Sequence, residues 1–174
     1  KGDGTDKFIL CEFDSAYNLD FSDYFTGVDG VFDVSLHFAD GAEVDVVNGT
    51  DYLGKFTVAG GNVDVSAVQL ITSAEIGYSF NVEAETLPVD AQVVGGPLTG
   101  QPRAINRVIL DLHDTLSVSV NGTALVIRQV TNNFSDPRQA VTGKEEFRLL
   151  GYSVDPTVKI TQTSPLSLQI NGLI

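Results

Sequence analysis

Carboxylate pairs are the first groups in this sequence whose type and spacing could do chemistry. A glycoside hydrolase uses two carboxyl groups that face each other across a cleft, usually with one of them in an apolar environment. Two carboxylates at positions i and i+2 of a strand point instead from the same face of one sheet. This spacing therefore predicts solvated strand faces rather than an acid–base pair. The pairs are Glu12 with Asp14, Glu43 with Asp45, and Glu83 with Glu85.

The run Asp111-Leu112-His113-Asp114 is the most site-like cluster of polar residues. On a strand, Asp111 and His113 share a face and Asp114 lies at the strand end. A bound transition metal usually takes three or four protein ligands, whereas the chain has only two histidines and one cysteine. We therefore expect a polar strand face here, with no metal and no cofactor.

The remaining candidate motifs are incomplete. Gly2–Asp6 and the turn Asn48–Asp51 supply oxygens that calcium could use, but neither has the ligand spacing or the closing Glu of a calcium loop. Cys11 lies in an alternating apolar stretch, and no serine stands in a Gly-x-Ser-x-Gly elbow. The run 142–145 lacks the upstream glycine of a phosphate-binding loop. The expectation is a protein that is not an enzyme and that acts through its surfaces.

The charge of the chain is strongly negative and unevenly distributed. The formal net charge is −13, and residues 1–100 carry 17 acidic residues against 3 lysines. Residues 101–174 carry 6 acidic and 7 basic residues, so the two halves differ in surface character. A surface this acidic repels phosphate, which disfavours sequence-specific binding of nucleic acid. The hydrophobic content of 43% nevertheless predicts a globular protein.

The start of the chain and its cysteine content give expectations about its context. The sequence begins at Lys1 and contains no Met, so we expect a piece of a longer protein. Cys11 has no partner for an intrachain disulfide, which is typical of a reducing compartment. No apolar run approaches the roughly 20 residues of a membrane helix, so a soluble protein without a membrane-spanning segment is expected.

Alternation with a period of two dominates the sequence. In Val31–Phe38, the residues Phe32, Val34, Leu36 and Phe38 fall on one face, which predicts a half-buried strand. Similar short runs recur between Asp-Gly and Asn-Gly turn signals, and no long amphipathic helix interrupts them. The predicted fold is all-β, with two small antiparallel sandwich-like or barrel-like units joined by a Pro/Gly-rich connection. The predicted bounds are 1–86 for an acidic β-rich domain, 87–105 for the connection and 106–174 for a second β domain.

An ordered series of short segments runs through most of the chain. The first half contains Asp40-Gly41-Ala42 and Thr57–Val63. The second half contains Glu85–Asp90, a Gly-rich stretch to Gly100, Arg103–Leu112, Leu116–Gly122, Leu150-Gly151-Tyr152 and Val158–Gln162. In this order and spacing the chain resembles the C-terminal region of phage tail proteins of the tail tubular protein B or nozzle type, including the small β-domain before that region.

The resemblance implies a virion structural protein of the distal tail tube of a short-tailed bacteriophage. It implies a homo-oligomer, a hexameric ring around the channel through which DNA leaves, in contact with other phage tail proteins. DNA would pass without sequence-specific binding, because acidic residues that line a channel repel the phosphate backbone. The implied location is the tail of the virion, after assembly in the cytoplasm of the host bacterium.

Basic residues of the second half are the candidates for contacts between subunits. Opposite the acidic first half of a neighbouring copy they would provide electrostatic complementarity, which sets register and partner choice. A competing hypothesis is a β-sandwich adhesin or carbohydrate-binding module of a tail or surface protein. That module would need an aromatic platform, whereas the chain has no Trp and its five Tyr are scattered. The interface candidates are Arg103, Arg107, Arg128, Phe134 and Arg138.

Overall fold

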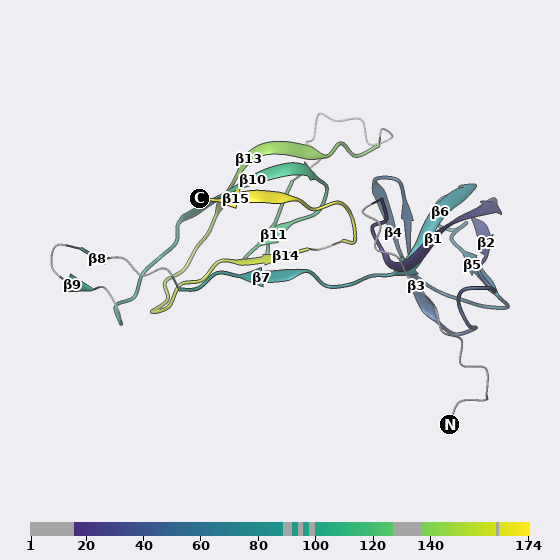
Figure 1. Cartoon of the computed structure of the whole chain (residues 1–174), viewed down its shortest axis with the longest axis horizontal. Coiled ribbons are helices and arrows are strands. Elements are labelled where there is room, and N and C mark those ends of the chain that lie inside the picture. The colour runs from purple at the N-terminus through teal and green to yellow at the C-terminus, as the bar shows by residue number, and fades with distance from the viewer. Residues whose placement is uncertain (1–15, 89–91, 94–95, 98–99, 127–136, 163) are drawn as a thin grey trace, which may run out of the picture.

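The chain is an all-β protein, as the sequence predicts. The computed structural model describes residues 16–88, 92–93, 96–97, 100–126, 137–162 and 164–174. Within these ranges every regular element is a strand, all strand pairs are antiparallel, and there is no helix that could cross a membrane. The strands form two units that follow one another along the long axis of the molecule (Figure 1).

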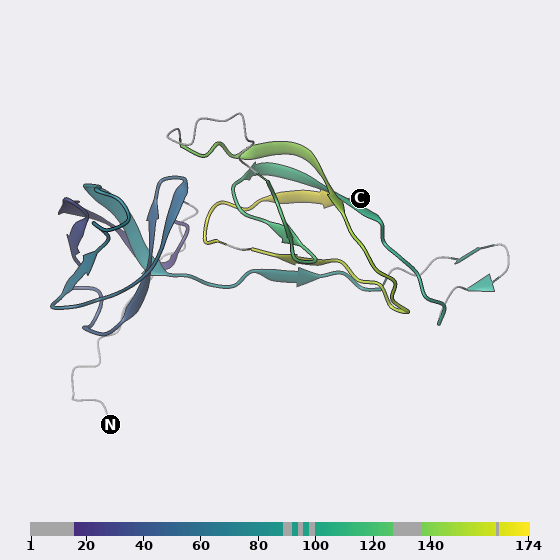
Figure 2. The ribbon, with the colours of Figure 1, turned by 180° about the vertical axis from the view of Figure 1, so that it is seen from behind.

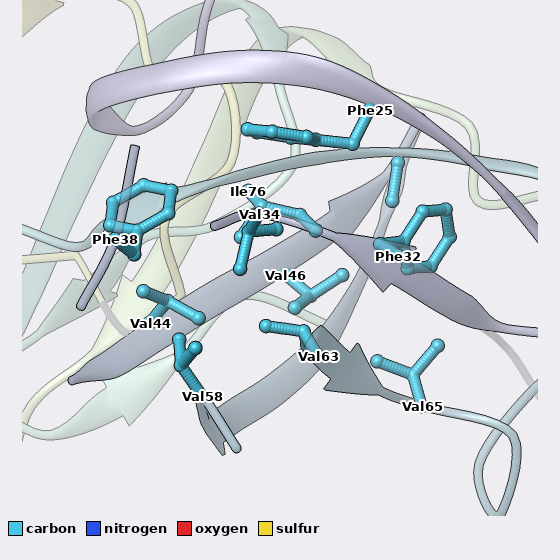
Figure 3. Close-up of a cluster of buried hydrophobic side chains, with 11 residues drawn as sticks. Phe25, Phe32, Val34, Phe38, Val44, Val46, Val58, Val63, Val65 and Ile76 are labelled. Atoms are coloured by element: carbon cyan, nitrogen blue, oxygen red, sulfur yellow. The ribbon is translucent and has the colours of Figure 1, made fainter. Parts of the chain in front are cut away.

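The first unit is one curled sheet of six strands. In spatial order these strands run β4-β3-β6-β1-β2-β5. Period-two alternation turns one face of each strand inward, so that Val44 and Val46 of β3 meet Ala74 and Ile76 of β6 in an apolar core (Figure 3). The bounds are β1 (Asp20–Val28), β2 (Val31–Asp33), β3 (Glu43–Asn48), β4 (Asp51–Thr57), β5 (Asn62–Asp64) and β6 (Ser73–Tyr78).

The six strands are two copies of one three-stranded unit. β1 and β4 begin 31 residues apart, at Asp20 and Asp51, and residues 20–35 match residues 51–66 at seven of 16 positions. β2 and β5 are also 31 residues apart, and β3 and β6 are 30 apart, which corresponds to a deletion of one residue. The identical pairs are Asp20/Asp51, Phe25/Phe56, Thr26/Thr57, Gly30/Gly61, Asp33/Asp64, Val34/Val65 and Ser35/Ser66.

A local twofold axis relates the two copies. β2 pairs with its own counterpart β5 about the central pair Phe32 and Val63, and β3 pairs with its counterpart β6 about Val46 and Ile76. The backbone bonds repeat as well, since Val34 N donates to Gly61 O (2.9 Å) and Val65 N donates to Gly30 O (2.8 Å). Self-paired elements of this kind are typical of the isologous contacts in symmetric dimers. The fold of the first unit is thus that of a symmetric pair within one chain.

A tight turn follows Asp33. The strand predicted at Val31–Phe38 is therefore too long, because β2 ends at Asp33. The Asp33 carboxylate accepts hydrogen bonds from Ser35 N (3.0 Å) and Ser35 Oγ (2.7 Å), and Phe38 N donates to Val34 O. These local bonds compete with strand pairing and turn the chain away from the sheet. Leu36, which alternation places in the core, is therefore exposed.

The same turn recurs in the second copy. Ser66 N donates to the Asp64 carboxylate (2.9 Å), and Gln69 N donates to Val65 O. In both turns the serine hydroxyl and the serine backbone N–H lower the pKa of the aspartate. A carboxyl group with a lowered folded-state pKa stabilises the fold above its unfolded pKa, and this stability is lost as the pH falls through the folded value.

The two aspartates should therefore make the stability of the first unit depend on acid pH. The double variant Asp33→Asn/Asp64→Asn keeps an amide oxygen in each turn but cannot titrate. We expect its unfolding temperature to fall less steeply than that of the parent between about pH 5 and about pH 2.5. Ser35→Ala/Ser66→Ala should flatten the same slope, since it removes the hydroxyl donors. Parallel curves for the parent and both double variants would contradict this assignment.

The second unit is a sandwich of two small sheets. One sheet has the order β13-β10-β15 and the other β12-β11-β14-β7, and the hairpin β8-β9 stands apart from both. Val108, Leu110 and Leu112 alternate inward along β10 and pack on Val118 and Val120, as their spacing predicts. The bounds are β7 (Glu83–Glu85), β8 (Gln92–Val93), β9 (Gly96–Pro97), β10 (Arg107–Thr115), β11 (Ser119–Val120), β12 (Thr123–Ala124), β13 (Val141–Arg148), β14 (Lys159–Thr161) and β15 (Ile170–Leu173).

The chain passes from the first unit to the second between β6 and β7, over residues 79–82. β7 already pairs with β14, so residues 83–85 belong to the sheet of the second unit. The region 87–105, for which the sequence predicts a connection, contains the hairpin β8-β9 and leads from β7 to β10. The two units are thus joined by a short segment and by the contacts described next.

A small apolar junction connects the two units. Leu19 and Val47 of the first unit pack with Leu116 and Leu166 of the second, and all four side chains are buried. Beside them, Arg138 Nε lies 3.2 Å from Asp51 Oδ1. Both side chains of this ion pair are about one third exposed, so the pair adds little to stability and mainly orients the contact. The apolar cluster supplies most of the attraction.

Candidate assembly surface

Two buried carboxyl groups lie on the outer face of the first sheet, at equivalent positions of its two copies. Asp45 of β3 is 2% exposed and Glu75 of β6 is 1% exposed, so the predicted solvated face of the Glu43/Asp45 pair is wrong for Asp45. The incoming chain and the second unit cover this face near Val47. Burial of a carboxyl group requires hydrogen-bond partners, and each of the two has them.

Each of these carboxyl groups holds a chain segment at one end of the first unit. The Glu75 carboxyl accepts bonds from Asn18 N (2.7 Å) and Leu19 N (2.7 Å), where the chain enters the sheet. The Asp45 carboxyl accepts bonds from Ser79 N (3.1 Å), where the chain leaves it, and from Tyr52 Oη (2.6 Å). Burial, followed by this bond and the nearby charge of Asp45, raises the pKa of Tyr52 to about 12. These bonds join the strands to the segments before and after them, which points to a structural role.

The metal and acid–base candidates do not gather into a site in the part of the chain that the structure describes. No three His, Cys, Asp or Glu side chains lie close enough there to hold a metal ion. Asp111 and His113 lie on the outer face of β10, and Lys144 stands opposite Asp111 on the neighbouring strand β13. Glu83 pairs with Lys159 at 2.8 Å on the surface of the second unit. Cys11 and Gly2–Asp6 lie outside the described residues.

The end of the second unit that lies away from the first is a ribbon of two antiparallel segments, 103–107 and 148–154, which we name the tip ribbon. Arg103 and Ser153 exchange two backbone hydrogen bonds of 2.8 Å, and Leu149 N donates to Asn106 O. Arg107 and Arg148 form the next cross-strand pair. The tip ribbon therefore continues β10 and β13 beyond the sandwich (Figure 1).

Large apolar side chains project from the tip ribbon into solvent. Leu150 is fully exposed, Tyr152 is 83% exposed and Val154 is 44% exposed. A hollow of about 220 Å³ lies beside them, and Arg103, Ile105 and Tyr152 are among its lining residues. Single exposed apolar side chains are common on proteins, but three on one short loop indicate a contact surface.

Arginines border these apolar side chains. Arg107 and Arg148 stand directly opposite each other, and Glu146 lies between them, 3.7 Å from Arg107 Nη1 and 3.2 Å from Arg148 Nε. Arg103 Nη2 donates to Val154 O at 3.0 Å and so holds the loop. The Arg107 and Arg148 side chains are 62% and 87% exposed, so both can contact a partner beside Glu146. The tip ribbon thus combines apolar area with cations.

The structure brings together two of the five predicted interface residues. Arg103 and Arg107 both lie in the tip ribbon. Arg138 lies at the junction between the two units, beside Asp51 of the same chain. Arg128 and Phe134 fall outside the described residues. The exposed Leu150 and Tyr152 are not among the predicted interface residues, although the apolar run Leu149-Leu150-Gly151-Tyr152 after a charged strand is a signal for them.

Two comparisons with known proteins find no match. A scan against models of protein families finds no family that matches the chain, and a search of curated proteins finds no match either. The function proposed next therefore starts from the surface of the molecule and its charge.

Proposed function

We propose that this chain is a structural module of the distal tail tube of a short-tailed bacteriophage, assembled as a ring of identical copies around the DNA exit channel. The observation that carries the proposal is the tip ribbon, where Leu150 and Tyr152 project beside Arg107 and Arg148. Apolar and arginine-rich surface is typical of protein–protein contacts. The ordered segments that resemble tail proteins of the nozzle type support this choice of assembly.

The negative charge of the first unit supports a position beside DNA without binding to it. Residues 16–80 hold ten Asp or Glu and a single lysine, Lys55. Such a surface repels the phosphate backbone, and the repulsion keeps DNA from sticking to a channel wall. In the proposed ring the first unit faces the channel, the protein belongs to the virion tail, and assembly takes place in the cytoplasm of the host.

Measuring the mass and shape of the purified chain tests this proposal. Light scattering over a range of concentrations should give a single large multiple of the 18.6 kDa monomer, and electron micrographs should show closed rings. In a ring, Asp and Glu side chains of the first unit should line the lumen. A monomer at every concentration would overturn the proposal, and so would a ring with Arg103 and Arg107 lining its lumen.

A further inference from the structure

A second exposed apolar surface lies at the far end of the first unit, which we name the distal patch. It consists of Val28 and Val31, on either side of the β1-β2 turn, and of Val68 and Leu70. Gly27 N donates to Thr72 O and Gly30 N donates to Ile71 O, so the β1-β2 hairpin and the segment 65–72 form one surface.

Close packing fixes this surface in place. A Cβ at Gly30 would lie 2.9 Å from both Gln69 O and Ser66 N, which shows how tightly the hairpin and the segment approach each other. The distal patch is therefore preformed, and a partner would bind it without first ordering a loop.

The duplicated fold does not require the apolar side chains of the distal patch. The local twofold axis places Ala59 where Val28 stands and Asn62 where Val31 stands, and Ala59 pairs with Asn62 in an isolated bridge as Val28 pairs with Val31. The second copy thus builds the same hairpin region without large apolar side chains at these two positions. The valines of the first copy are extra to the fold, which points to a contact with another molecule.

Charge determines which surface can cover the distal patch. Asp29 lies in its hairpin turn and Asp64 stands opposite Val31 across the β2-β5 pair. Two distal patches face to face would bring these carboxylates together, so a self-paired contact is disfavoured. Among the described residues the first unit has one lysine, whereas the tip ribbon of the second unit carries Arg103, Arg107 and Arg148 beside Glu146. The complementary surface is therefore the tip ribbon.

The two surfaces lie toward opposite ends of an elongated molecule, and the β8-β9 hairpin extends beyond the tip ribbon (Figures 1 and 2). The β1-β2 hairpin lies at the end away from the second unit, and the tip ribbon extends from the sandwich in the other direction (Figures 1 and 2). One copy can therefore contact two neighbours at once. A contact between two different surfaces generates a ring if its rotation closes, and an open filament if it does not.

We propose that copies of this chain associate head to tail, with the distal patch of one copy on the tip ribbon of the next. This inference rests on the proposed ring and specifies the surfaces that build it. Leu150 and Tyr152 supply apolar area to cover Val28, Val31, Val68 and Leu70. Arg107 and Arg148 come to face the aspartates at the edge of the distal patch, and these charges fix which end meets which.

Two variants that each lose one surface test this arrangement. The tip variant is Leu150→Ser/Tyr152→Ser, and the patch variant is Val28→Ser/Leu70→Ser. All four side chains are exposed in the single chain, so both variants should fold, as circular dichroism can check. Each variant alone should be monomeric at concentrations where the parent is oligomeric, because losing two apolar contacts weakens association by about a hundredfold. The matched control is Leu36→Ser, on the equivalent turn of the first copy, and it should assemble like the parent.

Mixing the two variants gives the decisive result. The tip variant keeps its distal patch and the patch variant keeps its tip ribbon, so an equal mixture should form a one-to-one heterodimer and nothing larger. If the mixture stays monomeric while the parent forms rings, or if either variant forms rings alone, the head-to-tail contact is wrong and the proposed ring stands. If the parent itself is monomeric at every concentration, the ring fails and the head-to-tail contact fails with it.

Discussion

Replacing Glu75 with glutamine is expected to lower the free energy of unfolding by about 3 kcal/mol. The Glu75 side chain is 1% exposed and accepts four hydrogen bonds, from Asn18 N, Leu19 N, Asn18 Nδ2 and Ser22 Oγ. A glutamine offers one acceptor oxygen in place of two and turns an NH₂ group toward groups that are themselves donors. The two backbone N–H groups and Ser22 Oγ all donate to Oε1, so the NH₂ group would replace Oε2 and face the Asn18 Nδ2 donor. Two donors that face each other away from water are costly.

Urea unfolding followed by circular dichroism measures this loss. The control is Glu43→Gln on the neighbouring strand β3, where the side chain is exposed and the change should cost less than about 0.5 kcal/mol. Both substitutions remove one negative charge, so their difference isolates the buried hydrogen bonds. Equal stabilities of the two variants would show that Glu75 does not hold the incoming segment.

Phe32→Ala is expected to destabilise the first unit by about 4 kcal/mol, more than any other single truncation in that core. Among the residues that the structure describes, Phe32 is the largest fully buried side chain, and it stands at the centre of the β2-β5 pair. Its removal leaves a cavity in an apolar core. At the equivalent position, Val63→Ala removes a smaller volume and should cost about 2 kcal/mol.

The same urea unfolding measurement compares the cost of these two core truncations with that of a truncation on the surface. Leu36→Ala, at an exposed position three residues after Asp33, should alter the stability by less than about 0.5 kcal/mol. If Phe32→Ala cost no more than Leu36→Ala, the assignment of Phe32 to the centre of the core would be wrong. If Val63→Ala cost more than Phe32→Ala, the cost would not follow the volume removed and the cavity argument would be wrong.

Alternation in the sequence is sufficient to predict the fold class. Val108, Leu110 and Leu112 are buried as their spacing predicts, and the Asn121-Gly122 turn joins β11 to β12 with positive φ at both residues. Alternation fails after Asp33, because a local hydrogen bond from Ser35 competes with strand pairing. The 31-residue repeat contains the missing signal, since Asp33-Val34-Ser35 and Asp64-Val65-Ser66 mark the same turn twice.

The surfaces are harder to predict than the strands. An outward-facing Glu75 is expected in solvent, and only the packing of distant segments against β6 buries it. Arg103 and Arg107 can be selected from charge alone, whereas Leu150 and Tyr152 lie in an irregular loop where period-two alternation carries no information. Position in three dimensions, at the end of the second unit, is what joins these four residues into one surface.

The local twofold axis also has an evolutionary consequence. A chain that supplied only one copy would have to pair with an identical partner, and both of its outer faces would be chemically the same. Fusion of two copies in one gene frees each face to acquire its own residues. Tyr52 at the junction now bonds to Asp45, while its counterpart Phe21 packs on Phe38 and Tyr78. Val28 likewise faces solvent where its counterpart is Ala59. Duplication is thus what allows one small sheet to hold its own second unit at one end and to offer a different surface at the other.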